Sequence, residues 1–207
     1  MNILKLMICI LMALILTACS GSSESTASTV PLKISLLGDS IAKRFSSDIL
    51  QSQPSLPQGS VVENLGRPGL CTIEGYDWTT RLIQSMPRGW IGIYFSGIND
   101  ARRCGTSVDN FASMIKGLSD TARSDGKRFI VVTPNPTFAS PENELLSLYA
   151  NAERKTGVEI FDLRLLLETT VLPFDYGKEL AYDGTHLTPT IYNWMAPLLI
   201  QKILTTP

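Results

Sequence analysis

The sequence is poor in the residue types that hold metal ions. Among 207 residues there are four cysteines and a single histidine, His186. A structural zinc site usually needs four histidine and cysteine ligands, and no Asp-rich loop has the spacing of a calcium site. The glycines around Gly97 form neither a phosphate-binding loop nor a dinucleotide-binding fingerprint. The sequence therefore predicts no metal and no cofactor.

The chain also lacks an excess of charge of either sign. It has 18 Lys and Arg residues against 19 Asp and Glu residues, and no run rich in lysine and arginine. Proteins that bind nucleic acid neutralise several phosphates with clustered cations, so nucleic acid is not an expected partner. There is no internal repeat. The length and a hydrophobic content of 44% favour one domain with a buried core.

No apolar run in the sequence reaches the roughly 20 residues that a membrane-spanning helix needs. A shorter run, Leu6 to Leu16, follows Lys5 and precedes small residues. A charged, an apolar and a small-residue region in this order are typical of a secretory signal. We therefore expect residues 1–18 to be a signal peptide and the chain to be exported. A transmembrane anchor is the alternative, and the shortness of the run disfavours it.

The signal ends in Leu16-Thr17-Ala18-Cys19, which resembles a bacterial lipobox. The resemblance implies cleavage before Cys19 and lipidation of its thiol, so that acyl chains hold the protein at a membrane. Residues 20–29 are almost all small and polar, which is typical of a flexible tether. We assign residues 19–30 to the lipidated cysteine and tether. Ser20 resembles the residue found in lipoproteins sent to the outer membrane. The expected location is thus the bacterial cell envelope, at the outer membrane and facing the periplasm.

From residue 30 onward, apolar segments alternate with amphipathic ones. The expected strands are 32–37, 61–65, 90–95, 128–133 and 158–162. The expected helices are 41–50, 76–85, 108–123, 141–155, 163–167 and 188–204, with a kink or local break at Pro197, and residues 172–182 are expected to form a loop. Regular alternation of strand and helix predicts a parallel sheet with helices on both faces.

Gly38-Asp39-Ser40 lies where the first expected strand ends and a helix begins. A hydroxyl there is close to backbone N–H groups and to the positive end of the helix dipole, both of which favour developing negative charge. This is a suitable position for a nucleophile. Taken alone, the triplet is more typical of a turn glycine and a helix N-cap. We expect the Asp39 side chain to point away from the nucleophile and to be structural.

Three further motifs follow in the chain. They are Asn64-Leu65-Gly66, Ser96-Gly97-Ile98-Asn99-Asp100 and Asp183-Gly184-Thr185-His186. Gly66 and Asn99 each follow the end of an expected strand, so they converge with Ser40 at one edge of the sheet. Together the four stretches resemble the SGNH (GDSL-type) hydrolase family, with Ile41 in place of the leucine of the name.

The resemblance covers the chain from about residue 32 to the last helix, and residues 31–207 are assigned to one SGNH hydrolase domain. It implies an α/β fold of the flavodoxin-like type. In this fold a five-stranded parallel sheet of order 2-1-3-4-5 lies between two layers of helices.

The resemblance assigns Ser40 as the nucleophile, His186 as its base and Asp183 as the residue that orients the imidazole. A serine hydroxyl is a weak nucleophile until a base takes its proton, and an imidazole flanked by a carboxylate is the usual base. The oxyanion would be bound by the backbone N–H groups of Ser40 and Gly66 and by the side-chain amide of Asn99. Alternatively, Gly66 could serve only a turn and Asn99 only a cap.

These residues predict a serine esterase that cleaves carboxylic esters through an acyl-enzyme. The expected substrates are short acyl or acetyl groups on carbohydrate, or acyl esters of lipids. Two alternatives stay open, namely an acyltransferase that uses the same site and a non-catalytic, envelope-anchored binding or scaffold lipoprotein. Four aromatic side chains could line a substrate pocket or could equally belong to the core, namely Tyr76, Trp78, Phe138 and Tyr182.

The remaining question is the state of the cysteines. Cys9 would leave with the signal peptide and Cys19 would carry lipid, so Cys71 and Cys104 would remain in an oxidising compartment. We predict that these two form a disulfide, which would join the two loops that carry predicted oxyanion donors. The alternative is a pair of unrelated buried thiols.

Overall fold

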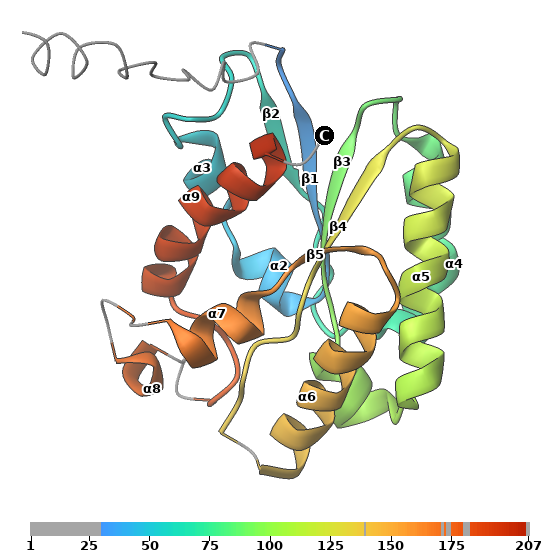
Figure 1. Cartoon of the computed structure of the whole chain (residues 1–207), viewed down its shortest axis with the longest axis vertical. Coiled ribbons are helices and arrows are strands. Elements are labelled where there is room, and N and C mark those ends of the chain that lie inside the picture. Colours follow the sequence, from blue (N-terminus) through green and yellow to red (C-terminus); the bar gives the residue numbers. More distant parts are fainter. Residues whose placement is uncertain (1–29, 139, 171, 173–174, 180–182, 206–207) are drawn as a thin grey trace, which may run out of the picture.

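The computed structural model describes residues 30–138, 140–170, 172, 175–179 and 183–205 (Figure 1). The predictions for the signal peptide, for the lipidated Cys19 and for most of the tether lie outside the described residues. Tyr182 lies outside them as well.

A five-stranded sheet forms the middle layer of the molecule. Its strands are β1 (Lys33–Gly38), β2 (Val61–Asn64), β3 (Ile91–Phe95), β4 (Arg128–Val132) and β5 (Glu159–Phe161). In space they follow the order β2-β1-β3-β4-β5, and each neighbouring pair is parallel. The predicted fold class and strand order are therefore confirmed.

The central strands are mostly apolar and almost wholly buried because helices cover both of their faces. All five residues of β3 are buried, as are all residues of β1 after Lys33. A parallel sheet that is covered twice selects continuous apolar runs rather than alternation. From β1 the chain moves first to β2 on one side and later to β3 on the other. The carboxyl ends of β1 and β3 therefore mark the switch point, where α/β proteins bind ligands.

Helices of two groups cover the two faces (Figure 1). The first group is α4 (Thr72–Ser85), α5 (Val108–Ser124) and α6 (Ser140–Lys155). The second group contains α2 (Ser40–Arg44), α3 (Ser47–Gln51), α7 (Leu163–Thr169) and α9 (Pro189–Thr205). This division follows from right-handed crossovers that leave β1 in opposite directions. None of the helices in the described part of the chain combines the length and hydropathy that a bilayer span requires.

The helix expected over 41–50 is instead two short helices, α2 and α3, that are separated after Arg44. The side-chain amide of Asn64 donates to the carbonyl groups of Ala42 and Phe45, at 2.8 and 2.7 Å. These contacts satisfy carbonyl groups at the carboxyl end of α2, which ends the helix. A side chain from β2 thus overrides the local helical pattern.

Three other elements differ from expectation. Helix α4 begins four residues before the expected start at residue 76. A π-helix, η1 (Asp100–Cys104), and a short helix, α8 (Tyr176–Glu179), form where no helix was predicted. Helix α9 continues through Pro197, so a local break there is wrong, and the kink predicted as its alternative stays a prediction.

Candidate active site

The turn between β1 and α2 presents Ser40 at the carboxyl edge of the sheet. Gly38 has a φ of 112°, and a Cβ atom at this position would lie 1.7 Å from the Phe95 carbonyl oxygen in β3. Only glycine fits this close approach. The Asp39 N–H then donates to the same carbonyl, at 3.1 Å, and Asp39 Oδ1 accepts from the Ile41 N–H at 2.8 Å. The first bond ties the turn to β3, and the second caps α2, of which Ser40 is the first residue.

The structure brings Ser40, Asp183 and His186 together. His186 Nε2 lies 2.8 Å from Ser40 Oγ, and His186 Nδ1 lies 2.5 Å from Asp183 Oδ2. Ser40 and His186 are 146 positions apart in the sequence. The arrangement allows the ring to accept a proton from Ser40 at one nitrogen while it donates to a carboxylate from the other.

Asp183 is held as a carboxylate. Its burial disfavours charge, but the backbone N–H and ring of His186 and the N–H of Thr185 outweigh this and lower the pKa of Asp183 to about 2. Both backbone N–H groups donate to Asp183 Oδ1 at 3.0 Å, which leaves Oδ2 for the ring. Asp183 therefore favours the tautomer with a proton on Nδ1, and it leaves Nε2 as the acceptor that faces Ser40.

The loop before His186 is anchored from two sides. Thr185 is fully buried, and its carbonyl accepts a hydrogen bond of 3.1 Å from the side chain of Asn135. Its hydroxyl accepts from the guanidinium of Arg102. Neither anchor belongs to a motif that sequence analysis singled out. Each reaches Thr185 across 50 or more positions of sequence, so no local pattern could have revealed it.

The predicted oxyanion donors lie at the same edge of the sheet, and two of them have acceptors within the protein. The Gly66 N–H donates to Asn64 Oδ1 at 2.9 Å, and Asn99 Nδ2 donates to the Leu70 carbonyl at 3.2 Å. The Asn99 amide has a second hydrogen available. The oxyanion roles of Ser40, Gly66 and Asn99 stay predictions.

Two buried acids lie beneath this edge. Asp100 is fully buried and accepts from the N–H and the hydroxyl of Thr72 and from the hydroxyl of Thr106, at 2.9 to 3.0 Å. It thereby connects η1 to the first turn of α4. Asp39 is also buried, and its Oδ2 has no hydrogen-bond partner among the described residues. Burial raises the pKa of Asp39 to about 7.

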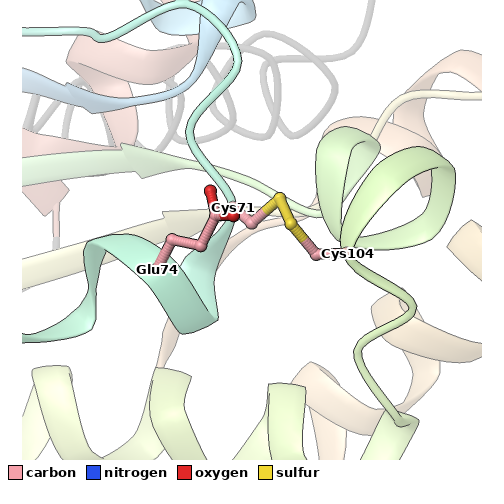
Figure 2. A group of neighbouring side chains, drawn as sticks. All are labelled: Cys71, Glu74 and Cys104. Atoms are coloured by element: carbon pink, nitrogen blue, oxygen red, sulfur yellow. A yellow bond between two sulfur atoms is a disulfide. The ribbon is translucent and has the colours of Figure 1, made fainter.

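Cys71 and Cys104 form the predicted disulfide (Figure 2). It joins the residue before α4 to the last residue of η1. Glu74 lies beside the two sulfur atoms, and in the described part of the chain these three residues are a group with the spacing of metal ligands. The sulfur atoms are bonded to each other, so they are not the thiolates that a metal ion needs. Arg103 instead pairs with Glu74, at 2.5 Å.

A groove of about 350 Å³ lies elsewhere, along β5 between α7 and α9. It is lined by Ile160, Leu166, Leu198 and neighbouring residues, none of which belongs to the four motifs. The candidate active site is therefore the edge formed by the carboxyl ends of β1 and β3, where the motifs meet.

Comparison with known proteins finds similarity in structure. No protein-family model matches the sequence, and neither does any curated protein. A lipase/acylhydrolase from Enterococcus faecalis is 22% identical, with a TM-score of 0.62 over 83% of this chain and 95% of that one. An acetylxylan esterase from Geobacillus stearothermophilus is 17% identical, with a TM-score of 0.65 over 85% and 96% of the two chains. An α/β hydrolase from the metagenome of Lake Arreo in Spain is 16% identical, with a TM-score of 0.66 over 86% and 99%. These likenesses show that the chain has the fold of these proteins.

Proposed function

We propose that this protein is a serine esterase of the SGNH type, which hydrolyses carboxylic esters through an acyl-enzyme. The observation that carries the proposal is the hydrogen-bonded series from Ser40 Oγ to His186 Nε2, at 2.8 Å, and from His186 Nδ1 to Asp183 Oδ2, at 2.5 Å. A nucleophile, a base and an orienting group in this order are the parts that acyl transfer requires.

In the proposed reaction, His186 Nε2 takes the proton of Ser40 as Oγ attacks the ester carbonyl carbon. The bond from this carbon to the alcohol oxygen then breaks, and the imidazolium returns the proton to the departing alcohol. Water repeats the sequence on the acyl-Ser40 ester, which releases the carboxylic acid. Asp183 stays ionised throughout, in keeping with its low pKa, and stabilises the imidazolium that forms twice.

The tetrahedral intermediate carries an oxyanion that needs hydrogen-bond donors. We assign this role to the N–H groups of Ser40 and Gly66 and to the amide of Asn99. Losing one such donor typically costs about 3 kcal/mol of barrier. When the oxyanion forms, the Gly66 N–H would have to donate to it either in place of Asn64 Oδ1 or in a bond shared with that oxygen.

The proposed substrates are short acyl or acetyl groups on carbohydrate, or acyl esters of lipids. The acetylxylan esterase among the similar structures supports the first class. Phe138 supports an apolar contact beside the site, because the residue is 61% exposed and its N–H donates to the Gly184 carbonyl, two residues before His186. Aromatic rings bring a large apolar contact area to binding surfaces.

The test is release of p-nitrophenol from p-nitrophenyl acetate by the purified domain. We expect Ser40→Ala and His186→Ala each to remove nearly all activity, because triad members act as a unit. Ser124→Ala is the matched control, since this serine only caps the end of α5 through the Thr121 carbonyl. Full activity in Ser40→Ala would exclude the mechanism. A native domain that binds acetylated oligosaccharide without turnover would favour a binding protein, and acyl transfer to an added alcohol would favour an acyltransferase.

We further propose that the protein is exported and held by lipid on Cys19 in the bacterial cell envelope, at the outer membrane. The support is the order of charged, apolar and small residues that leads to Cys19. The membrane would then be a partner through acyl chains alone.

A further inference from the structure

Arg102 joins three segments that are far apart in the sequence. It lies in η1, three positions after Asn99. Its Nε donates to Glu142 in α6, and its Nη2 donates to the hydroxyl of Thr185, which precedes His186. One planar group thus connects the loop of a predicted oxyanion donor, a helix of the outer layer and the loop of the predicted base.

The backbone that carries Arg102 is fixed on both sides. Asp100, two positions earlier, is fully buried and bonded to Thr72 and Thr106. Cys104, two positions later, is bonded covalently to Cys71. Because η1 is held at both ends, the guanidinium can act as a rigid support for whatever it contacts.

Arg102 contacts Thr185, which helps to position the predicted base. Thr185 donates its N–H to Asp183 Oδ1 at 3.0 Å, and the next residue along the chain, His186, donates to the same oxygen. A movement of Thr185 would therefore move both the carboxylate and the imidazole. Asn135 holds the Thr185 carbonyl on one side, and Arg102 holds the hydroxyl on the other.

We propose that Arg102 is a positioning residue, which fixes the Asp183–His186 pair relative to Ser40 by holding Thr185. This inference rests on the proposed esterase function. A fixed fork of donors can serve Glu142 and Thr185 at once, whereas the single ammonium group of lysine is a point charge on a flexible stem. The role therefore requires arginine and not merely a positive charge.

The chain offers a matched control in Arg128. This arginine also bridges a carboxylate and an oxygen of a third element, because it pairs with Glu159 and donates to the Ile203 carbonyl at 2.7 Å. Its side chain is 25% exposed, and that of Arg102 is 37% exposed. Arg128, however, is the first residue of β4, at the opposite edge of the sheet from Ser40. Removal of either arginine should lower the free energy of unfolding by a similar amount. Only the removal of Arg102 should alter the geometry of the site.

The kinetic test compares Arg102→Gln, Arg102→Lys and Arg128→Gln with the native domain on p-nitrophenyl acetate. For Arg102→Gln we expect kcat to fall about tenfold to a hundredfold with little change in KM, since a misplacement of about 1 Å can cost a hundredfold in rate. Arg102→Lys should recover only a small part of the loss. Arg128→Gln should keep native kcat. Equal losses of kcat in Arg102→Gln and Arg128→Gln would overturn the proposal, because the effect would then be general destabilisation.

A second readout does not depend on activity. The protein has one histidine, so the ring nitrogen signals in a ¹⁵N NMR spectrum of the labelled protein come from His186 alone. In the native domain we expect one protonated and one unprotonated nitrogen, as the Asp183 contact requires. In Arg102→Gln the two signals should move toward each other as the tautomers mix. An unchanged spectrum in Arg102→Gln would overturn the positioning role of Arg102. A native domain that hydrolyses no ester would instead contradict the proposed function, and the NMR comparison would still test the role of Arg102.

Thr185 supplies a test that keeps Arg102 in place. Thr185→Ser retains the hydroxyl that Arg102 contacts, whereas Thr185→Val removes it at nearly the same volume. We expect Thr185→Ser to keep the native His186 ring signals and Thr185→Val to reproduce the ring signals of Arg102→Gln. The double variant Arg102→Gln/Thr185→Val should be no worse than either single variant, as for two partners in one interaction. Additive effects would overturn the link between the two residues.

Discussion

Asp183 differs from the other two members of the candidate triad in how many groups it serves. Its Oδ1 accepts two backbone N–H groups, of Thr185 and His186, and its Oδ2 faces the ring. In Asp183→Asn the amide oxygen can keep the two backbone contacts, which turns the NH₂ group toward His186 Nδ1. An NH₂ group there favours the tautomer with a proton on Nε2, and the lone pair that should accept the Ser40 proton is lost.

We therefore expect Asp183→Asn to stay folded while kcat falls by about three to four orders of magnitude, as in other triads that lose the correct tautomer. The loss should be smaller than that of Ser40→Ala. The measurement is kcat on p-nitrophenyl acetate together with a thermal melt, because a variant that melted far below the native domain would not isolate the tautomer. Native kcat in a folded Asp183→Asn protein would remove Asp183 from the triad.

Asp39 introduces a dependence of stability on pH beside the nucleophile. Its folded pKa is about 7 and its ordinary value is 3.8, because burial disfavours the carboxylate. A folded pKa above the unfolded one means that its contribution is fully present below pH 3.8 and is lost as the pH rises through 7. The native chain should therefore lose stability between pH 4 and 7 on account of this residue.

We expect Asp39→Asn to remove this loss, since asparagine also caps helices and does not titrate. Between pH 5 and 8 the stability of the native chain should fall relative to that of the variant by about 3 kcal/mol. Urea unfolding of both proteins across this range measures the difference. Asp48→Asn, at an exposed aspartate in the first turn of α3, is the control. Parallel pH profiles for native and Asp39→Asn proteins would show that Asp39 is not buried as a titrating acid.

At the scale of elements, Gly66 allows the loop after β2 to pack directly on the helix that begins with Ser40. A Cβ atom at Gly66 would lie 2.5 Å from the Lys43 backbone nitrogen and 2.9 Å from its Cα in α2. These atoms cannot move without moving α2. We expect Gly66→Ala to lower kcat about a hundredfold, because the displacement reaches the nucleophile and a predicted oxyanion donor together.

The control for this change is Gly69→Ala in the same loop. A Cβ at Gly69 meets nothing within 4 Å, although its φ of 79° imposes about 1 kcal/mol of backbone strain on alanine. This variant should melt at a slightly lower temperature and keep kcat within a few-fold of native. If Gly66→Ala and Gly69→Ala had the same kcat, close packing against α2 would not be what the glycine provides.

The disulfide acts on two elements at once, because it joins the start of α4 to the end of η1. The two cysteines are separated by 33 positions, and closing a loop of this length is worth about 3 to 4 kcal/mol in a chain-entropy account. We expect Cys71→Ser and Cys104→Ser to lower the melting temperature and kcat alike, with the double variant no worse than either single one. Free thiols titrated at both positions in the oxidised, folded domain would contradict this.

The central strands were predictable from sequence because they are mostly apolar runs ended by turn residues, as in Ile91–Phe95. The break between α2 and α3 was not, because it depends on the Asn64 side chain, about twenty positions later in the chain. The π-helix over Asp100–Cys104 coincides with a buried carboxylate and a disulfide that only the folded chain supplies. Local propensity therefore located the strands and the longer helices, whereas long-range contacts set the ends of several elements.

The candidate site divides in the same way. Ser40, Asp183 and His186 lie in short motifs that sequence alone can find. Arg102 and Asn135, which hold the loop of the base through Thr185, make contacts over 83 and 50 positions. No spacing rule connects residues so far apart, so these supports become visible only when the sheet has brought the segments together.

At the scale of the whole molecule, the start of the described chain and the site lie at opposite ends of β1. The described chain begins at residue 30, just before the amino end of β1, and Ser40 follows the carboxyl end of the same strand. Six residues of extended chain separate these ends by about 20 Å. If Cys19 carries lipid, the domain can present Ser40 away from the membrane surface, toward soluble or polymeric esters.

This arrangement leads to the last prediction, which separates anchoring from catalysis. A cleavable, non-lipidated signal fused to a Cys19→Ala chain should move the protein from the detergent phase to the aqueous phase, because its acyl anchor is lost. The kcat and KM for a soluble ester should stay native, since the described chain begins at the end of β1 that is opposite Ser40. If membrane lipids are the substrate, the released protein should cleave esters in vesicles more slowly than the anchored protein does. Partition of Cys19→Ala into detergent would contradict lipidation, whereas a fall in kcat on the soluble ester would contradict the separation of tether and site.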